Sequence, residues 1–277
     1  MFSDYSGQHQ GATHEAYSFL VATQDQIVEW LPLRQRFRDQ WLPDRRRISF
    51  KQLREPMRRR AFPHFLNLVG QLPANLITIM ISQHVGSFVV GGPAALAREL
   101  NDCFVPGTPN HTVEKIYRLA LFVATLNAGL REEAQRSLWI SDHDETLDTF
   151  EKRECFGRLA TYLTFGLTGW RNAADHGFVT TAASGLPEWV EDVAAIPDIA
   201  AGASARLCDL LPVFMGRPTW TVPISQFDKV DWRARLFGDW LSARESELRH
   251  VLVRLERDSL GMVRASAQQF VRRASDG

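Results

Sequence analysis

The sequence predicts an α/β protein in which strands and helices alternate along the chain. Residues 75–82 (NLITIMIS) form an apolar run of strand length, whereas residues 112–130 have helical periodicity and are apolar around most of the helix. At 277 residues, of which 45% are hydrophobic and 23% charged, the chain is long enough to bury a full core. We therefore expect a mixed sheet flanked by helices.

The N-terminal third is expected to begin with an antiparallel hairpin. Residues 16–22 (AYSFLVA) are rich in aromatic and apolar side chains, as in a buried strand. Leu33, Phe37 and Trp41 recur every four residues and predict a helix that Pro32 either opens or kinks. The expected elements are strands at 1–4, 16–22 and 75–82, a helix up to Trp41, and a basic helix after residues 45–50.

The rest of the chain is expected to be richer in helix. Asp148 and Glu151 have the spacing of a capping box at a helix start, and Pro197 is expected to kink or restart a later helix. The expected helices are 93–102, 112–130, 148–166, 189–211, 232–255 and 262–273, with strands at 137–141 and 178–182. The last two helices predict a division of the chain into a core domain of residues 1–211 and a C-terminal helical extension of residues 212–277 that packs on the core.

Several classes of protein are disfavoured by what the sequence lacks. It has neither an uninterrupted apolar run of about 18 residues nor the layout of a signal peptide at its start, so we expect a cytoplasmic protein with no membrane partner. Cys103, Cys155 and Cys208 are far apart and have no histidine at ligand spacing, which disfavours structural zinc and a disulfide framework. No nucleophile elbow or phosphate-binding loop is found.

Basic residues are concentrated in one segment, although the formal net charge of the chain is zero. Between Arg34 and Arg60 there are eleven basic residues and three acidic ones, a local excess of eight positive charges. Arginine suits phosphate, so this segment predicts contact with nucleic acid. A solvated helical face is the alternative, because only four of the 32 basic residues are lysine. The candidate contacts are Arg45, Arg46, Arg47, Lys51, Arg54, Arg58, Arg59 and Arg60.

Acidic residues occur at the edges of distant apolar runs, and three motifs there resemble one family. Residues 4–7 (DYSG) resemble the D-E-S-G that opens a bacterial domain-of-unknown-function group with an RNase H-like core. Residues 196–202 (IPDIAAG) resemble that group's late A-D-L-I-A-G helix, and residues 139–144 (WISDHD) resemble its strand ending in aspartate. The motifs occur in the group's order, with Tyr5 and Pro197 in place of its glutamate and alanine.

The resemblance implies an RNase H-like core and a magnesium-dependent nuclease or nucleic-acid processing enzyme. It implies that Asp4, Asp142, Asp144 and Asp198 are the catalytic residues and hold one or two Mg²⁺ (or Mn²⁺) ions. Magnesium prefers oxygen ligands, and a metal pair activates water for phosphodiester cleavage. From the residues alone, each aspartate is also explained as a cap or a solvated polar position. Asp192 is off the Asp198 face of its helix and is expected to be structural.

The alternative is a protein without catalytic activity. It is a catalytically inactive RNase H-like scaffold that binds a protein partner through its C-terminal helices, in a larger defence or mobile-element assembly. Eight tryptophans, among them Trp232 and Trp240, supply side chains that are common at interfaces. Exposure of these tryptophans distinguishes an interface from an ordinary core.

Overall fold

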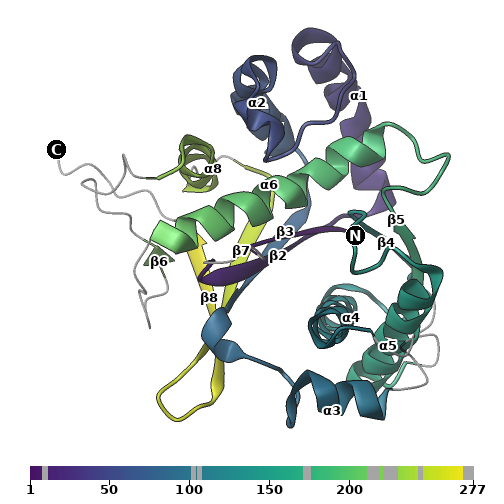
Figure 1. The fold of residues 1–277 in the computed structure, drawn as a ribbon. Helices are drawn as coiled ribbons and strands as arrows, with labels where there is room; N and C mark the ends of the chain where they lie inside the picture. Colours follow the sequence, from purple (N-terminus) through teal and green to yellow (C-terminus); the bar gives the residue numbers. More distant parts are fainter. Residues whose placement is uncertain are drawn as a thin grey trace. The chain divides into compact units, whose positions relative to one another are not determined.

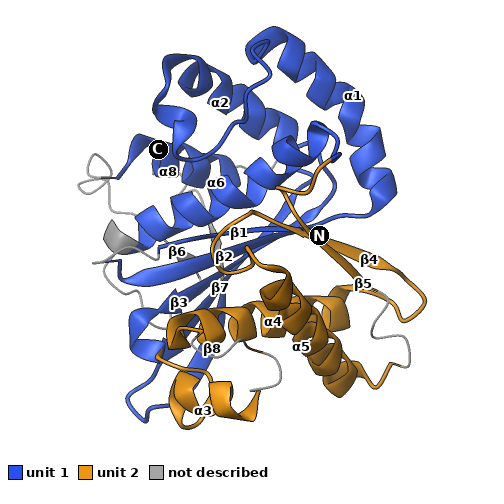
Figure 2. Ribbon diagram, turned by 45° about the vertical axis from the view of Figure 1, so that its right-hand side comes forward, with its two compact units in different colours: residues 1–85, 185–277 blue, residues 86–184 orange. Residues whose placement is uncertain are grey.

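The structure divides into two compact units, of which the first is discontinuous in sequence. The computed structural model describes residues 1–7, 12–100, 104, 108–170, 176–210, 219–220, 230–242 and 246–270. Unit 1 comprises residues 1–85 and 185–277, and unit 2 comprises residues 86–184 (Figure 2). Both ends of the chain contribute to unit 1, and the domain boundary expected at residue 211 lies outside the described residues.

Unit 1 contains a mixed sheet whose strands are ordered β1-β2-β3-β7-β8-β6. The pairs β1–β2, β2–β3 and β7–β8 are antiparallel, whereas β3–β7 and β6–β8 are parallel. The predicted N-terminal hairpin is therefore confirmed. The strands are β1 (Phe2–Ser6), β2 (His14–Val21), β3 (Asn75–Ser82), β6 (Thr219–Trp220), β7 (Arg249–Arg257) and β8 (Val263–Phe270).

Helix α6 (Trp189–Leu210) crosses the β1-β2-β3 part of this sheet (Figure 1) and packs against all three strands. It is apolar on almost every side, as expected of a helix buried between the sheet and further helices. Pro197 lies inside α6, and Pro32 lies inside α1 rather than at its start. The other helices of unit 1 are α1 (Gln24–Trp41), η1 (Gln52–Arg54), α2 (Pro56–Val69), η2 (Gln83–Val85) and α8 (Trp232–Ser242).

Unit 2 contains a parallel strand pair joined by a helix. Strands β4 (Ser137–Ser141) and β5 (His176–Thr180) are connected through α5 (Phe150–Thr168), and Trp139 of β4 packs against Phe156 of α5. Long parallel crossovers of this kind favour a helix because it covers one face of the strands. Helices α3 (Gly92–Glu99) and α4 (Asn110–Leu130) complete the unit, and α4 packs against α5.

Three sequence expectations are wrong. Residues 249–257 and 263–270 form strands that pair with β3 and with each other, so the expected helices 232–255 and 262–273 are replaced, beyond Ser242, by a hairpin. Helix α5 is capped by Thr149, which accepts from the Lys152 N–H, while Asp148 pairs with the Lys152 ammonium. Cys155 is buried and disulfide-bonded, against the expectation from cysteine spacing.

The predicted α/β class with a mixed sheet is confirmed. Strand β3 has the predicted bounds 75–82, β4 has the predicted bounds 137–141, and the other expected elements up to residue 210 are present with shifted ends. None of the helices in the described part of the chain has the length and apolar character that crossing a bilayer requires.

Candidate functional site

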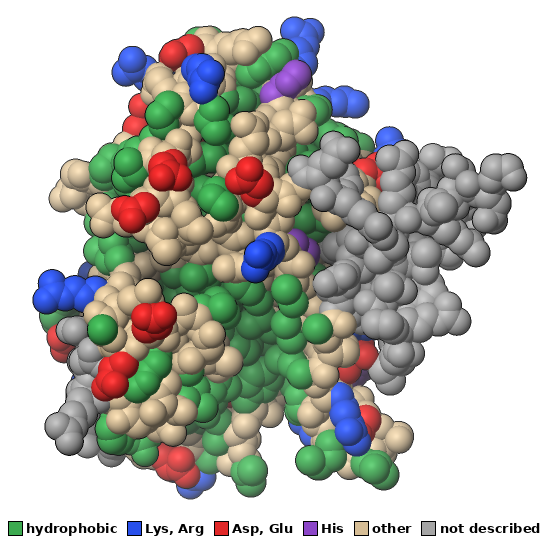
Figure 3. Space-filling view, turned by 180° about the vertical axis from the view of Figure 1, so that it is seen from behind, with side chains coloured by type: hydrophobic (Ala, Val, Ile, Leu, Met, Phe, Trp, Pro, Cys, Tyr) green, Lys and Arg blue, Asp and Glu red, His purple; other side chains and the backbone are tan. Residues whose placement is uncertain are grey.

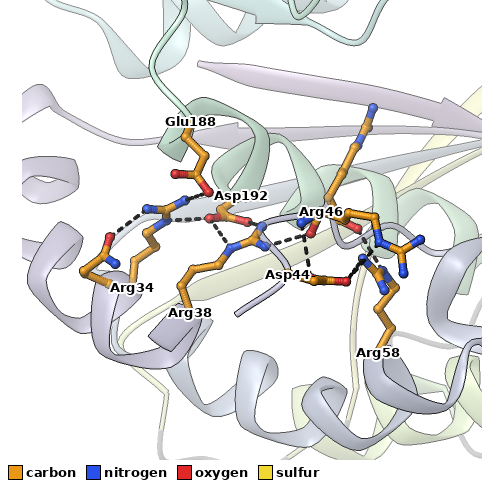
Figure 4. A network of polar contacts seen from close by, with 9 residues as sticks. Arg34, Arg38, Asp44, Arg46, Arg58, Glu188 and Asp192 are labelled. Carbon is orange, nitrogen blue, oxygen red and sulfur yellow. Dashed lines mark hydrogen bonds and ion pairs between the residues drawn. The ribbon is translucent and has the colours of Figure 1, made fainter. Parts of the chain in front are cut away.

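The basic segment begins with two arginines that are buried against one aspartate. Arg34 and Arg38 of α1 both donate through Nε to Oδ2 of Asp192 in α6, at 2.5 Å and 2.9 Å, and Arg38 also pairs with Oδ1 (Figure 4). The Asp192 side chain is 1% exposed. A buried carboxylate of this kind is stabilised only because both of its oxygens are paired. The expectation that Asp192 is structural is confirmed.

Buried arginines also hold the backbone of the segment that follows α1. Arg38 donates to the carbonyl oxygen of Arg46 at 2.7 Å, and Arg58 of α2 donates to that of Arg47 at 3.0 Å. The Arg58 guanidinium, 1% exposed, also pairs with Glu55 at 2.8 Å and Asp44 at 3.2 Å. The segment between α1 and α2 is thus held by side chains that point away from solvent.

Phe50 anchors the same segment to α6 and α8. Its N–H donates to Oδ2 of Asp198 at 2.6 Å, and its carbonyl oxygen accepts from Nη1 of Arg233 at 2.7 Å. Gly202 of α6 leaves room for the ring, since a Cβ there would come within 2.5 Å of it. The missing side chain at Gly202 therefore allows the Phe50 ring to pack closely against α6. Hydrogen bonds from Arg233 hold the pKa of the Asp231 carboxyl below its ordinary value, although burial acts in the opposite direction.

The eight candidate nucleic-acid contacts fall into two groups. Three have carboxylate partners: Arg58 as described, Arg46 with Asp44 at 3.0 Å, and Arg47 with Asp4 at 3.8 Å. The other five are exposed and, within the described residues, have no carboxylate partner: Arg45, Lys51, Arg54, Arg59 and Arg60. Pairing with a carboxylate, rather than burial, thus separates the two groups, because Arg46 is paired although it is exposed.

Arg54, Arg59 and Arg60 line one open hollow of about 410 Å³ together with Pro56. We call these three arginines and the hollow the arginine face. Arg54 ends the short helix η1, and Arg59 and Arg60 lie on the first turns of α2. The Arg59 guanidinium lies 4.8 Å from the centre of the Trp232 ring in α8, an arrangement typical of a cation–π contact. The arginine face is a concave, positively charged surface suited to an anion.

Two of the four candidate catalytic aspartates lie in unit 1, and both contact the segment that precedes the arginine face. Asp4 is buried on β1, opposite Ser18 of β2, and its carboxylate pairs with Arg47. Asp198 accepts from the Phe50 N–H, as described above. The segment from Arg47 to Phe50 therefore links two acids that the sequence places almost 200 residues apart.

The other two candidate aspartates lie in unit 2, after β4. Asp142 accepts a hydrogen bond from Thr181 at 3.0 Å, and Asp144 pairs with Lys115 at 2.6 Å. Asp144 also accepts from the backbone and hydroxyl of Thr146, which is a turn-forming pattern. Each candidate aspartate thus has a partner within its own unit. Nowhere in the described ranges do three His, Cys, Asp or Glu side chains form a group suited to a metal ion.

The sequence alone does not reveal which carboxylates pair with the buried arginines. Arg38 and Asp192 are 154 residues apart, and no local pattern connects them. The phase of α2 was a usable signal, because Arg58 falls on the apolar face with Phe62 and Phe65, whereas Arg59 and Arg60 fall outside it.

Charge is dispersed on the face of the described residues that Figure 3 shows. In the view of Figure 3, acidic and basic side chains of the described residues stand apart among hydrophobic and neutral ones. This distribution agrees with the zero net charge of the chain and makes the arginine face a local feature.

Comparisons with protein-family models, with curated proteins and with solved structures find no match to this chain.

Proposed function

We propose that this protein binds nucleic acid and that the arginine face holds the phosphate backbone. The observation that carries the proposal is that Arg54, Arg59 and Arg60 line one hollow while having no carboxylate partner among the described residues. Unpaired guanidinium groups bind phosphate through charge-assisted, often bidentate hydrogen bonds. A neutral chain that concentrates cations in one place binds a polyanion locally.

The contacts that hold the backbone beneath these arginines support the same proposal. The segment that leads to Arg54 is anchored at Asp198, at Arg233 and at the buried Arg58, and Leu53 next to Arg54 is fully buried. Because the backbone beneath the arginines is fixed, less conformational entropy is lost when they bind a ligand. A merely solvated helical face has no need of such anchoring.

Metal-dependent cleavage is a second proposal, favoured by one observation. Asp4 and Asp198, which the resemblance makes catalytic, both contact the segment next to the arginine face. An antiparallel β1-β2-β3 sheet and a parallel β4–β5 pair with a helical crossover are also elements of an RNase H-like core. The aspartates do not fit a metal as they stand, since each has a protein partner, and we derive no catalytic step through Mg²⁺.

Binding is tested by fluorescence anisotropy with labelled DNA and RNA over a series of salt concentrations. The variant carries Arg54→Glu, Arg59→Glu and Arg60→Glu. The matched control is Arg36→Glu, because Arg36 is exposed on α1 and has no partner among the described residues. We expect weaker binding and a salt slope reduced by about 2 to 3 in the triple variant, since each lost phosphate contact removes about 0.7 to 0.9.

Two outcomes overturn the binding proposal: a wild type that binds no nucleic acid, and a triple variant that behaves like the Arg36→Glu control. The same samples, incubated with Mg²⁺ or Mn²⁺, test cleavage. If the wild type cuts nucleic acid, the second proposal requires that cutting be lost in Asp4→Ala and Asp198→Ala. Binding without cutting would leave the inactive scaffold as the better description of the core.

A further inference from the structure

The exposed side of α2 carries more than positive charge, because an aromatic stack lies at each of its edges. At one edge, His64 stacks on Trp41 of α1, with ring centres 3.6 Å apart and planes inclined by 14°. At the other edge, the Arg59 guanidinium lies over the Trp232 ring. Trp232 is itself steadied by an edge-on contact with Phe62 of α2, at 6.1 Å.

The helical phase of α2 places Arg60 between these two stacks. Arg60 and His64 are four residues apart and are therefore neighbours on one side of the helix. Arg59 lies at the opposite edge of the exposed side, because successive residues are offset by about 100° around a helix. His64 and Arg60 are exposed, while Trp41 and Trp232 are half-buried behind their partners. Each tryptophan thus supports a flat, exposed group beside the arginines.

We propose that α2 binds single-stranded nucleic acid, with bases stacked on His64 and on Arg59 and with phosphates held by Arg54 and Arg60. This inference rests on the proposed function and names its substrate class. Proteins that bind single strands combine a positively charged groove with flat side chains that stack on unpaired bases. In a duplex the base faces are covered by their neighbours, so the two stacks contribute only when the bases are unpaired.

The test compares three labelled ligands of equal length: an oligothymidylate, an abasic strand with the same phosphates, and a duplex. Stacking predicts that the wild type binds the oligothymidylate roughly 5-fold to 100-fold more tightly than the abasic strand. His64→Ala is expected to reduce binding to the oligothymidylate while leaving binding to the abasic strand unchanged. Arg60→Ala is expected to weaken binding to both, because both carry phosphates.

Matched variants keep this result interpretable. Trp41→Ala removes the support of His64, and Trp41→Phe is expected to restore most of the preference for bases. Tyr162→Ala is the control, since Tyr162 is an aromatic residue of unit 2 with 72% exposure. Circular dichroism shows whether each Trp41 variant is folded. If a Trp41 variant is unfolded, the test rests on His64→Ala, which should fold because His64 is exposed.

The outcomes separate this inference from the proposed function. Equal affinity for the oligothymidylate and the abasic strand, with no effect of His64→Ala, overturns the stacking inference while the binding function stands. Tighter binding of the duplex than of the single strand also overturns it. Failure to bind any of the three ligands overturns the proposed function itself.

Discussion

Arg58 and Arg60 are two residues apart in α2, yet they are used in opposite ways. Arg58 is 1% exposed and donates to two carboxylates and a backbone carbonyl, whereas Arg60 is exposed and lines the open hollow. The same contrast separates Arg34 and Arg38, which are buried against Asp192, from Arg54 and Arg59. Arginine content alone therefore does not measure the strength of a nucleic-acid surface.

The role of each of these arginines depends on whether it has a carboxylate partner. A buried guanidinium with two or three acceptors is part of the fold, and the loss of its partner leaves an uncompensated charge. An exposed guanidinium without a partner contributes little to folding and remains free to bind an anion. The two groups should thus respond differently to substitution, in stability and in binding.

The largest effect is expected from Asp192→Asn. The substitution leaves the buried Arg38 without a counter-charge and leaves Arg34 only its contact with Glu188 at 3.5 Å, which should lower the free energy of unfolding by about 3 to 5 kcal/mol. Urea unfolding followed by circular dichroism measures the loss. Asp39→Asn is the control, because Asp39 is exposed on the same helix and is expected to change stability by less than about 0.5 kcal/mol. Equal effects of the two variants would contradict the division into buried and exposed pairs.

Arg58→Ala and Arg60→Ala test the comparison within one helix. Arg58→Ala should lower the free energy of unfolding by about 2 to 3 kcal/mol, because hydrogen bonds to charged partners are lost in a buried place. Arg60→Ala should change it by less than about 0.5 kcal/mol but should weaken nucleic-acid binding. Unfolding and anisotropy measurements on both proteins check the pair. A larger loss of stability in Arg60→Ala than in Arg58→Ala would contradict the different roles of the two arginines.

Gly202→Ala tests whether the anchoring of the segment matters. The new methyl group would overlap the Phe50 ring, so we expect a loss of about 1 to 3 kcal/mol in stability. Weaker nucleic-acid binding should accompany this loss even though no charge changes. The control is Gly157→Ala, because Gly157 lies within α5 and has open space around its Cβ position. This variant should raise the free energy of unfolding by about 0.5 to 1 kcal/mol. Unchanged affinity in Gly202→Ala would show that the anchor is dispensable for binding.

Asp198 is predicted to have a structural role that is separable from any role in cleavage. Asp198→Ala leaves the Phe50 N–H without its acceptor, at a cost of about 1 to 2 kcal/mol, whereas Asp198→Asn keeps an oxygen that can accept. Urea unfolding should therefore rank the asparagine variant as the more stable. If the protein cleaves nucleic acid, both variants should lose cleavage, since an amide is a poor magnesium ligand compared with a carboxylate.

The smallest effect is expected from Asp44, which pairs with both the buried Arg58 and the exposed Arg46. Burial raises the pKa of the Asp44 carboxyl, but hydrogen bonds from Arg46 and Arg58 lower it by more, to below its ordinary value of 3.8. The ionised carboxylate therefore stabilises the fold above about pH 3.8, and this contribution is lost as the pH falls through the lowered pKa. Asp44→Asn should cost less than about 1 kcal/mol at pH 7. Unfolding at pH 7 and pH 3 should show this difference shrinking in acid.

Much of the fold could be predicted from local pattern, but the C-terminal hairpin could not. β3 is a short apolar run, and its bounds follow directly from the sequence. Val251, Val253 and Leu255 alternate along β7, which is a strand pattern. The amphipathic helix just before β7 led to the prediction of a single helix that continued through these residues. Its strand form depends on pairing with β3, which is distant in sequence. Tertiary pairing of this kind leaves little trace in a local window.

For the candidate site, composition located the basic segment but could not sort its members. The carboxylates that pair with Arg34, Arg38 and Arg47 come from α6 and β1, and only folding brings these groups together. The catalytic assignment of Asp4, Asp142, Asp144 and Asp198 stays a prediction, because it came from resemblance. The contacts of these aspartates show what each does for the fold.

The parallel pairing of β3 with β7 has a consequence for how this protein is made. Thr78 and His250, which hydrogen-bond across these strands, are 172 residues apart, so β3 leaves the ribosome long before its neighbour is synthesised. Unit 2 lies entirely between the two strands in sequence, and its parts are therefore translated first. Until then β3 is an open strand edge, which is a site for aggregation. This edge closes only when β7 has been synthesised and has paired with β3.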